Sequence, residues 1–160
     1  MRRPGQEAIS GSIPYVYTPR YSATDAAIYL LTWSGVAVIL ALALWLAPSP
    51  EGIGTHQALG LPPCWFLEAT GLPCPTCGLT TCFAYAAHLR FFDAARTQPF
   101  GLLQFAAFVA ALPGIPWLMR QRVPIEQIAL WPGLTRLAAG WTVLYLAGWA
   151  YKIAAMSGSL

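Results

Sequence analysis

Residues 26–47 carry no charged side chain and give the clearest membrane signal in the chain. A helix of about 20 apolar residues is as long as the hydrocarbon core of a bilayer is thick, roughly 30 Å. Ser22 or Thr24 is available to cap such a helix at its start, and Pro48 ends it. We therefore expect a membrane-spanning helix over residues 23–48.

Two further apolar runs predict spans over residues 97–120 and 132–156. The first of them contains Pro113 and Pro116, which a span tolerates where neighbouring helices satisfy the carbonyls that proline leaves free. We expect a kink at these prolines. Near the end of the last run, Lys152 is expected to extend its ammonium outward to the membrane interface.

The composition supports this interpretation. Fifty-seven per cent of the residues are hydrophobic and 9% are charged, whereas a typical soluble domain has about 25% charged residues. So few charges cannot cover a soluble surface of this size, so the outer surface must face lipid. The net charge of +3 is small, and the bases stand at the ends of apolar runs. This distribution argues against nucleic acid as a partner.

The chain is thus predicted to be an all-α integral membrane protein with three transmembrane helices and a short interfacial amphipathic helix between the first two. The remaining segments are a tail (1–22), a cysteine-bearing loop (49–78), the interfacial helix (79–96), a second loop (121–131) and a final tail (157–160). Six bases fall on the side of the amino terminus and three on the other (Arg2, Arg3, Arg20, Arg120, Arg122 and Arg136 against Arg90, Arg96 and Lys152). This bias predicts a cytoplasmic amino terminus, with the cysteine loop and the carboxyl terminus on the outer face.

The amino-terminal tail contains prolines and tyrosines and should be disordered by itself. Its aromatic side chains, Tyr15, Tyr17 and Tyr21, would supply contact area to a partner. Gly140 and Gly148 would let a neighbouring helix approach the last span closely. We therefore expect other membrane protein subunits as partners, bound through the tail and the transmembrane helices, besides the lipid bilayer.

All four cysteines lie between the first two predicted spans, at Cys64, Cys74, Cys77 and Cys82. Cysteines used as plain apolar filler would also occur among the spans, so this clustering is informative. Cys77 and Cys82 flank the start of the predicted interfacial helix, where the helix dipole lowers the pKa of a thiol.

Three uses of these cysteines remain open. Two disulfides would staple an extracytoplasmic loop. Alternatively, the Cys-Pro-Thr-Cys-Gly turn would hold zinc or iron, with Cys64 and Cys82 completing four ligands. As a third use, the same turn would exchange thiols and disulfides, although the βαβ pattern of thioredoxin-like enzymes is absent. His88 is a secondary candidate ligand or proton carrier, but a lone histidine beside aromatics more often serves in packing.

A longer motif surrounds these cysteines. Cys64 is followed by a Thr-Gly-Leu-Pro-Cys-Pro-Thr-Cys-Gly-Leu-Thr run that starts at Thr70, and by Pro99 at the start of the next span. The region resembles a family of bacterial membrane proteins of unknown function. This resemblance implies a multi-pass protein of the bacterial inner (cytoplasmic) membrane and brings no known activity. Thr81 stands where the family has an arginine, and Gln98 stands where it has an asparagine. Thr81 is therefore, like His88, a secondary candidate for a site residue.

From the sequence we favour a non-catalytic structural or accessory subunit of a larger membrane complex over an enzyme. Three helices are too few to enclose a transport route, and no uninterrupted span carries a charge. Two alternatives are a membrane thiol-disulfide oxidoreductase that uses Cys74 and Cys77, and a zinc- or iron-binding membrane module that uses the four cysteines.

Overall fold

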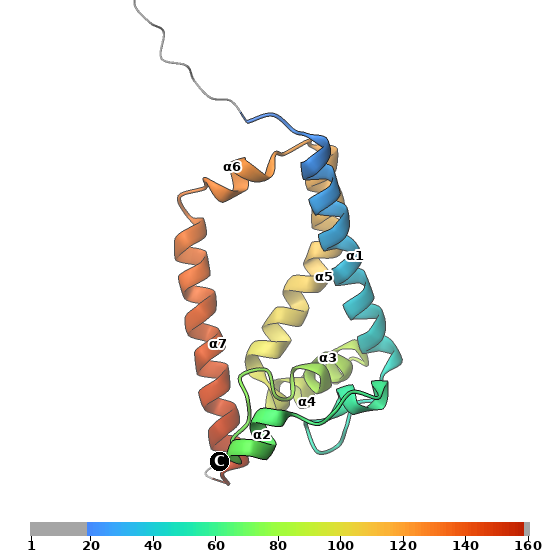
Figure 1. Cartoon of the computed structure of the whole chain (residues 1–160), viewed down its shortest axis with the longest axis vertical. Helices are drawn as coiled ribbons and strands as arrows, with labels where there is room; N and C mark the ends of the chain where they lie inside the picture. The colour runs from blue at the N-terminus through green and yellow to red at the C-terminus, as the bar shows by residue number, and fades with distance from the viewer. Residues whose placement is uncertain (1–18, 159–160) are drawn as a thin grey trace, which may run out of the picture.

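The computed structural model describes residues 19–158, and all regular structure in this part of the chain is helical. It contains α1 (Ala23–Trp45), the 3-10 helix η1 (Thr55–Leu59), α2 (Trp65–Thr70), α3 (Leu79–Ala87), α4 (Phe91–Thr97), α5 (Pro99–Arg120), α6 (Ile125–Ala129) and α7 (Leu134–Met156) (Figure 1). The predicted all-helical fold is confirmed for these residues. The predicted docking tail falls mainly in residues 1–18, outside the described part.

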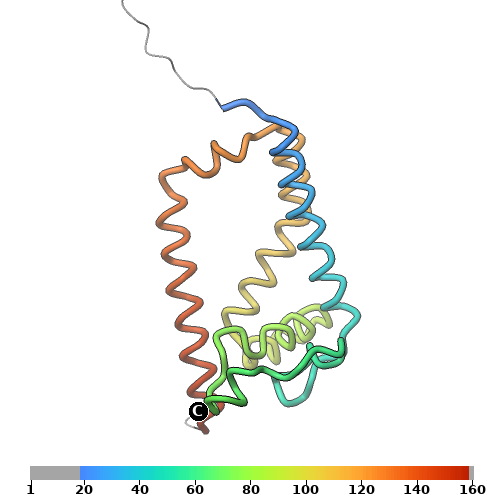
Figure 2. The backbone as a smooth tube through the Cα atoms, in the orientation of Figure 1, coloured from blue at the N-terminus to red at the C-terminus, as the bar shows by residue number. Residues whose placement is uncertain are grey.

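Three long helices, α1, α5 and α7, run the length of the molecule (Figure 1). Helix α5 contacts both α1 and α7, and α3 packs against α1, α4 and α5. As Figure 2 shows, the segment from η1 to α4 lies at one end, where α7 also finishes, and the segment containing α6 crosses to α7 at the opposite end. The cysteine segment and the last turns of α7 are thereby brought to the same end of the molecule.

The start of α1 is fixed by a capping box. Ser22 accepts a hydrogen bond from the backbone N–H of Asp25, and the Asp25 carboxylate accepts one from the backbone N–H of Ser22. The other carboxylate oxygen of Asp25 accepts from the N–H of Ile125 at 3.1 Å. Tyr29 adds a bond from its hydroxyl to the carbonyl of Val123 at 3.0 Å. These side chains bond backbone groups that have no partner within the helices, at the start of α1 and at the start of α6. They thereby tie the two elements to each other.

Helix α5 continues through both of its internal prolines. Pro116 has no N–H, so the carbonyl of Leu112 loses its partner within the helix. The indole Nε1 of Trp33, on α1, donates to that carbonyl at 3.0 Å. The expectation that a neighbouring helix would satisfy a carbonyl freed by proline is confirmed at this position.

Helices α1 and α5 are long and apolar enough to cross a membrane, judged by length and composition. The outer side of α1 exposes large apolar side chains, with Leu31 73% and Trp45 72% exposed. Helix α7 has 23 residues, as many as α1, but it does not meet the same criterion of apolar character. Its tryptophans, its tyrosines and Lys152 account for the difference. Two of the three predicted spans are thus supported by the fold.

The interfacial helix predicted over residues 79–96 is two helices, α3 and α4. Leu89 interrupts it with a φ of 61°, in the left-handed region that a leucine rarely adopts. The backbone N–H of Arg90 then bonds back to the carbonyl of Tyr85 at 2.9 Å. The two helices do not share one buried face: Thr81 of α3 is fully buried, while Phe92 of α4 is 69% exposed. Short helices η1, α2 and α6 also occupy the two predicted loops.

Replacing Trp33 with phenylalanine should destabilise the packing of α1 on α5 by about 1 kcal/mol, because the carbonyl of Leu112 loses the cross-helix donor found within residues 19–158. Thermal unfolding of the purified protein in detergent measures the loss. Trp117→Phe is the matched control, since Trp117 lies on the same helix as the acceptor and is 59% exposed. Equal melting temperatures for Trp33→Phe and wild type would contradict the assigned role.

Candidate functional site

Three of the four cysteines converge at the end of the molecule that holds the segment from η1 to α4. The Sγ atoms of Cys64, Cys74 and Cys77 all lie within 4.8 Å of one another; we call these residues the thiol cluster. Cys64 precedes α2, while Cys74 and Cys77 belong to the turn that leads into α3. All four cysteines of the chain are free thiols, so the predicted stapling disulfides are not formed.

The turn from Cys74 to Gly78 presents two thiols to one side. The backbone N–H of Cys74 donates to the Sγ of Cys77 at 3.3 Å, and the N–H of Cys77 donates to the carbonyl of Cys74 at 2.9 Å. Gly78 follows with a φ of 85°, which only glycine adopts without strain. The chain then enters α3 directly after the second thiol.

Two distant side chains hold this turn in place. Trp149 of α7 donates from Nε1 to the carbonyl of Pro73 at 2.8 Å. Gln98, which is 1% exposed, donates from Nε2 to the carbonyl of Pro75 at 3.4 Å. The backbone is thus anchored on both sides of Cys74 by residues from α7 and from the start of α5.

The thiol cluster opens into a cavity of about 330 Å³. His56 of η1 and Glu68 of α2 line the same cavity. Both residues belong to the segment predicted as a loop (49–78), and the fold brings each to the wall that contains the thiols. The Nε2 atom of His56 lies 3.1 Å from the carbonyl of Pro62. The cavity therefore offers an imidazole and a carboxylate in addition to three sulfurs.

The thiols at the two ends of the turn differ in acidity. Burial tends to raise the pKa of Cys74, but hydrogen bonds with Thr76, Cys77 and Cys64 outweigh it, so the net pKa lies below its ordinary value. Burial, together with the thiols of Cys74 and Cys64, raises the pKa of Cys77 to about 12. Without a metal, Cys74 is therefore the more readily ionised of the two.

Cys82, the predicted fourth ligand, does not join the thiol cluster. Its side chain is fully buried in α3, and its Sγ donates to the carbonyl of Gln98 at 3.3 Å. Burial raises the pKa of the Cys82 thiol to about 12, partly offset by the ammonium of Lys152. Cys82 lies one full turn into α3, so its sulfur points to the helix packing instead of the turn. It acts as a packing residue that joins α3 to the start of α5.

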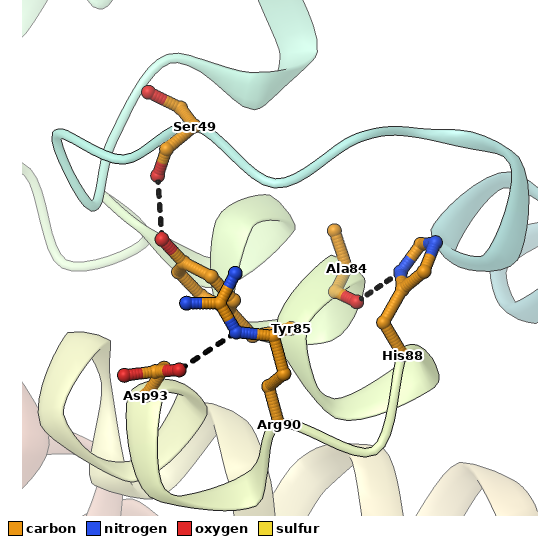
Figure 3. Close-up of polar contacts among 6 residues, drawn as sticks. All are labelled: Ser49, Ala84, Tyr85, His88, Arg90 and Asp93. Atoms are coloured by element: carbon orange, nitrogen blue, oxygen red, sulfur yellow. Dashed lines mark hydrogen bonds and ion pairs between the residues drawn. The ribbon is translucent and has the colours of Figure 1, made fainter.

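His88 and Thr81 are also placed away from the thiol cluster. The Nδ1 of His88 lies 2.8 Å from the carbonyl of Ala84, which can only accept, so the ring donates there and serves the end of α3 (Figure 3). Thr81 Oγ1 lies 2.8 Å from Thr55 Oγ1 and joins α3 to η1.

Lys152 does not extend outward as expected. It is 5% exposed, and its Nζ donates to the carbonyls of Gly52 and Thr97, each at 3.2 Å. The sequence signal was present, because Lys152 interrupts an otherwise uncharged run over residues 137–156. Such a residue either reaches the interface or turns to the protein interior, and only the fold shows that it turns inward.

The fold and the site together define an all-helical protein with two helices able to span a membrane and a cluster of three thiols at one end. Residues 64–112 match a family model described as a protein of unknown function, DUF2752. The match starts at Cys64 and covers the whole thiol cluster, which confirms the expected resemblance to a family of unknown function. No curated protein and no solved structure matches the chain.

Thiol labelling should follow the environments of the four sulfurs. In the presence of a chelator, alkylation of Cys74 should be faster at neutral pH than that of Cys77, because a lowered pKa leaves more thiolate and a pKa of about 12 leaves little. Cys82 should stay unreacted until the protein unfolds. Mass spectrometry of maleimide-labelled peptides across a pH series gives each rate. A Cys77 rate that matches that of Cys74 at every pH would refute this order.

Proposed function

We propose that this chain is a membrane-bound metal-binding protein, in which Cys64, Cys74 and Cys77 hold a zinc ion. The observation that carries the proposal is the approach of three sulfurs, from two separate segments, to within 4.8 Å of one another. Zinc–sulfur bonds of about 2.3 Å in a tetrahedral arrangement place the sulfurs about 3.8 Å apart. The three thiols therefore need to close by only about 1 Å to share one ion.

The kind of donor favours zinc among the common ions. Thiolates are soft ligands that select zinc, copper(I) or iron–sulfur centres over magnesium and calcium. The Cys-Pro-Thr-Cys-Gly turn resembles the knuckles that point two thiolates at one ion in zinc ribbons and rubredoxins. The fourth position is left to water, or to His56 or Glu68 after a movement of the side chain, since both line the same cavity but lie outside the cluster of three sulfurs. A metal ion bound here would fasten α2 to the start of α3, which is a structural role.

The membrane arrangement forms part of this proposal. With α7 as a third span beside α1 and α5, the thiol cluster and the end of α7 share one face of the membrane, and α6 lies at the other (Figure 1). The excess of basic residues then places the α6 end in the cytoplasm of a bacterial cell and the thiol cluster outside the inner membrane. The aromatic residues of α7 would serve as interfacial anchors.

A non-catalytic role as a subunit fits the exposed surface. Large apolar side chains on α1 and α7, such as Leu44 at 61% and Val143 at 65% exposed, must be covered by lipid or by other membrane subunits. A metal-fastened end would give a partner a rigid surface to recognise. In this proposal the metal supports the structure, and the partners bind through the long helices and the tail.

The purified protein should contain one zinc ion per chain. Serine at Cys64, Cys74 or Cys77 should each remove the metal, because each substitution takes away one of three protein sulfurs. Cys82→Ser is the matched control and should keep it, since Cys82 lies outside the cluster. Elemental analysis gives the stoichiometry, and cobalt substitution should give sulfur-to-metal charge-transfer bands that the three cluster variants lack.

A role of the same sulfurs in thiol–disulfide exchange predicts the opposite result for the metal content. If the turn exchanges thiols and disulfides, the isolated protein should contain no stoichiometric metal and should cycle between a Cys74–Cys77 disulfide and two thiols. Such a redox cycle in metal-free protein would overturn the metal proposal.

Membrane-impermeant maleimide should label Cys74 in intact spheroplasts at nearly the same level as in lysed membranes, because the thiol cluster is proposed to lie on the outer face. A cysteine introduced at exposed Gln121 should be labelled only after lysis. The labelling is read on the Cys64→Ser background, which releases the metal. Protection of Cys74 in intact spheroplasts together with labelling of position 121 would reverse the proposed orientation.

A further inference from the structure

Lys152 is a buried cation for which the described fold provides no carboxylate partner. Its Nζ bonds only the carbonyls of Gly52 and Thr97, and the ion pair found within residues 19–158 joins Arg90 to Asp93. Glu51 lines the same outer cavity as Lys152 but lies beyond ion-pairing distance. An ammonium at 5% exposure beside neutral carbonyls loses hydration without gaining an opposite charge. Such a residue needs an anion.

Besides the carboxylates of Glu51 and Asp93, which line the outer cavity, the groups near Lys152 that can become anionic are two thiols. Cys77 and Cys82 are its electrostatic neighbours. Gly78, which directly follows Cys77, makes this approach possible: a side-chain carbon at that position would lie 3.0 Å from the Nζ of Lys152 and 2.8 Å from the carbonyl of Gly52. The ammonium thus rests against the backbone that carries one of the three cluster sulfurs.

The net charge of the proposed metal centre is opposite in sign to that of the Lys152 ammonium. Three thiolates around a divalent ion leave one net negative charge, and a neutral fourth ligand such as an imidazole does not alter it. In a partly buried site, that charge is costly unless a cation lies near it. Lys152 supplies one positive charge, and the start of α3 adds the positive end of its dipole.

The same contacts link the metal centre to α7. Within one turn, Trp149 donates to the carbonyl of Pro73, Tyr151 to that of Arg96, and Lys152 to those of Gly52 and Thr97. The end of α7 is thereby held on the segment that carries Cys74 and Cys77. Any attraction between the metal centre and Lys152 acts across this contact and strengthens it.

We infer that Lys152 is the counter-charge of the tri-thiolate metal centre, so that metal binding and the docking of α7 stabilise each other. This inference rests on the proposed metal site. Lys152 is a positioning residue here and not a ligand. Because coupling between two sites is reciprocal, a change at Lys152 must alter metal affinity, and metal must alter the stability of the α7 contact.

Lys152→Met should weaken zinc binding roughly tenfold, which equals about 1.4 kcal/mol. Lys152→Gln keeps a hydrogen-bond donor but lacks the charge, so it should be weakened similarly, whereas Lys152→Arg should keep most of the affinity. Arg90→Met is the matched control: it removes an exposed cation at the same end of the molecule, already paired with Asp93. Competition with a chelating dye, on the full chain in detergent, gives each affinity.

A thermal measurement separates a counter-charge from a purely structural lysine. Zinc should raise the melting temperature of wild type and Arg90→Met more than that of Lys152→Met or Lys152→Gln, while the metal-free proteins melt within a few degrees of one another. An equal zinc-induced rise in all four proteins would overturn the inference and leave the metal site intact. A Lys152→Gln affinity equal to wild type would also overturn it. If wild type binds no stoichiometric zinc, the proposed function fails and the inference fails with it.

Discussion

The site depends on two hydrogen bonds that fix the backbone on either side of Cys74. Trp149 and Gln98 donate to the carbonyls of Pro73 and Pro75, and each donor comes from a helix distant in sequence. A turn with two prolines has few N–H groups of its own with which to satisfy carbonyls. Outside donors therefore decide where the two thiols of the turn point, and Cys64 meets them from the start of α2.

Much of the fold could be predicted from the sequence, because it follows from local patterns. The uncharged run over residues 26–47 predicts the helix observed as α1, and Ser22, one of the two expected caps, begins it in a capping box with Asp25. The clustering of cysteines between two apolar runs already indicated a site, and three of the four meet. In each case the signal lies within a few residues of the feature that it predicts.

The remaining features depend on contacts between distant segments. Leu89 breaks the helix predicted over residues 79–96, although a leucine is a good helix former. The packing of α3 between α1, α4 and α5 fixes the break between α3 and α4 at Leu89. The environment of Cys82 depends on the carbonyl of Gln98. The position of His56 depends on helix η1, which the loop sequence did not predict. No periodicity in the chain specifies such pairings.

The contrast between Asp25 and Lys152 shows how the fold distributes its buried charges. Asp25 has its charge satisfied locally, by the N–H of Ser22 and the N–H of Ile125, which are the free donors of two helix starts. Lys152 meets two carbonyls at the opposite end of the molecule, and these can share its protons without cancelling its charge. A carboxylate placed there would compete with the thiols for the ammonium and would make a second anion for the proposed metal centre to repel. A neutral carbonyl shell leaves the positive charge of Lys152 free to act on the sulfurs of the turn.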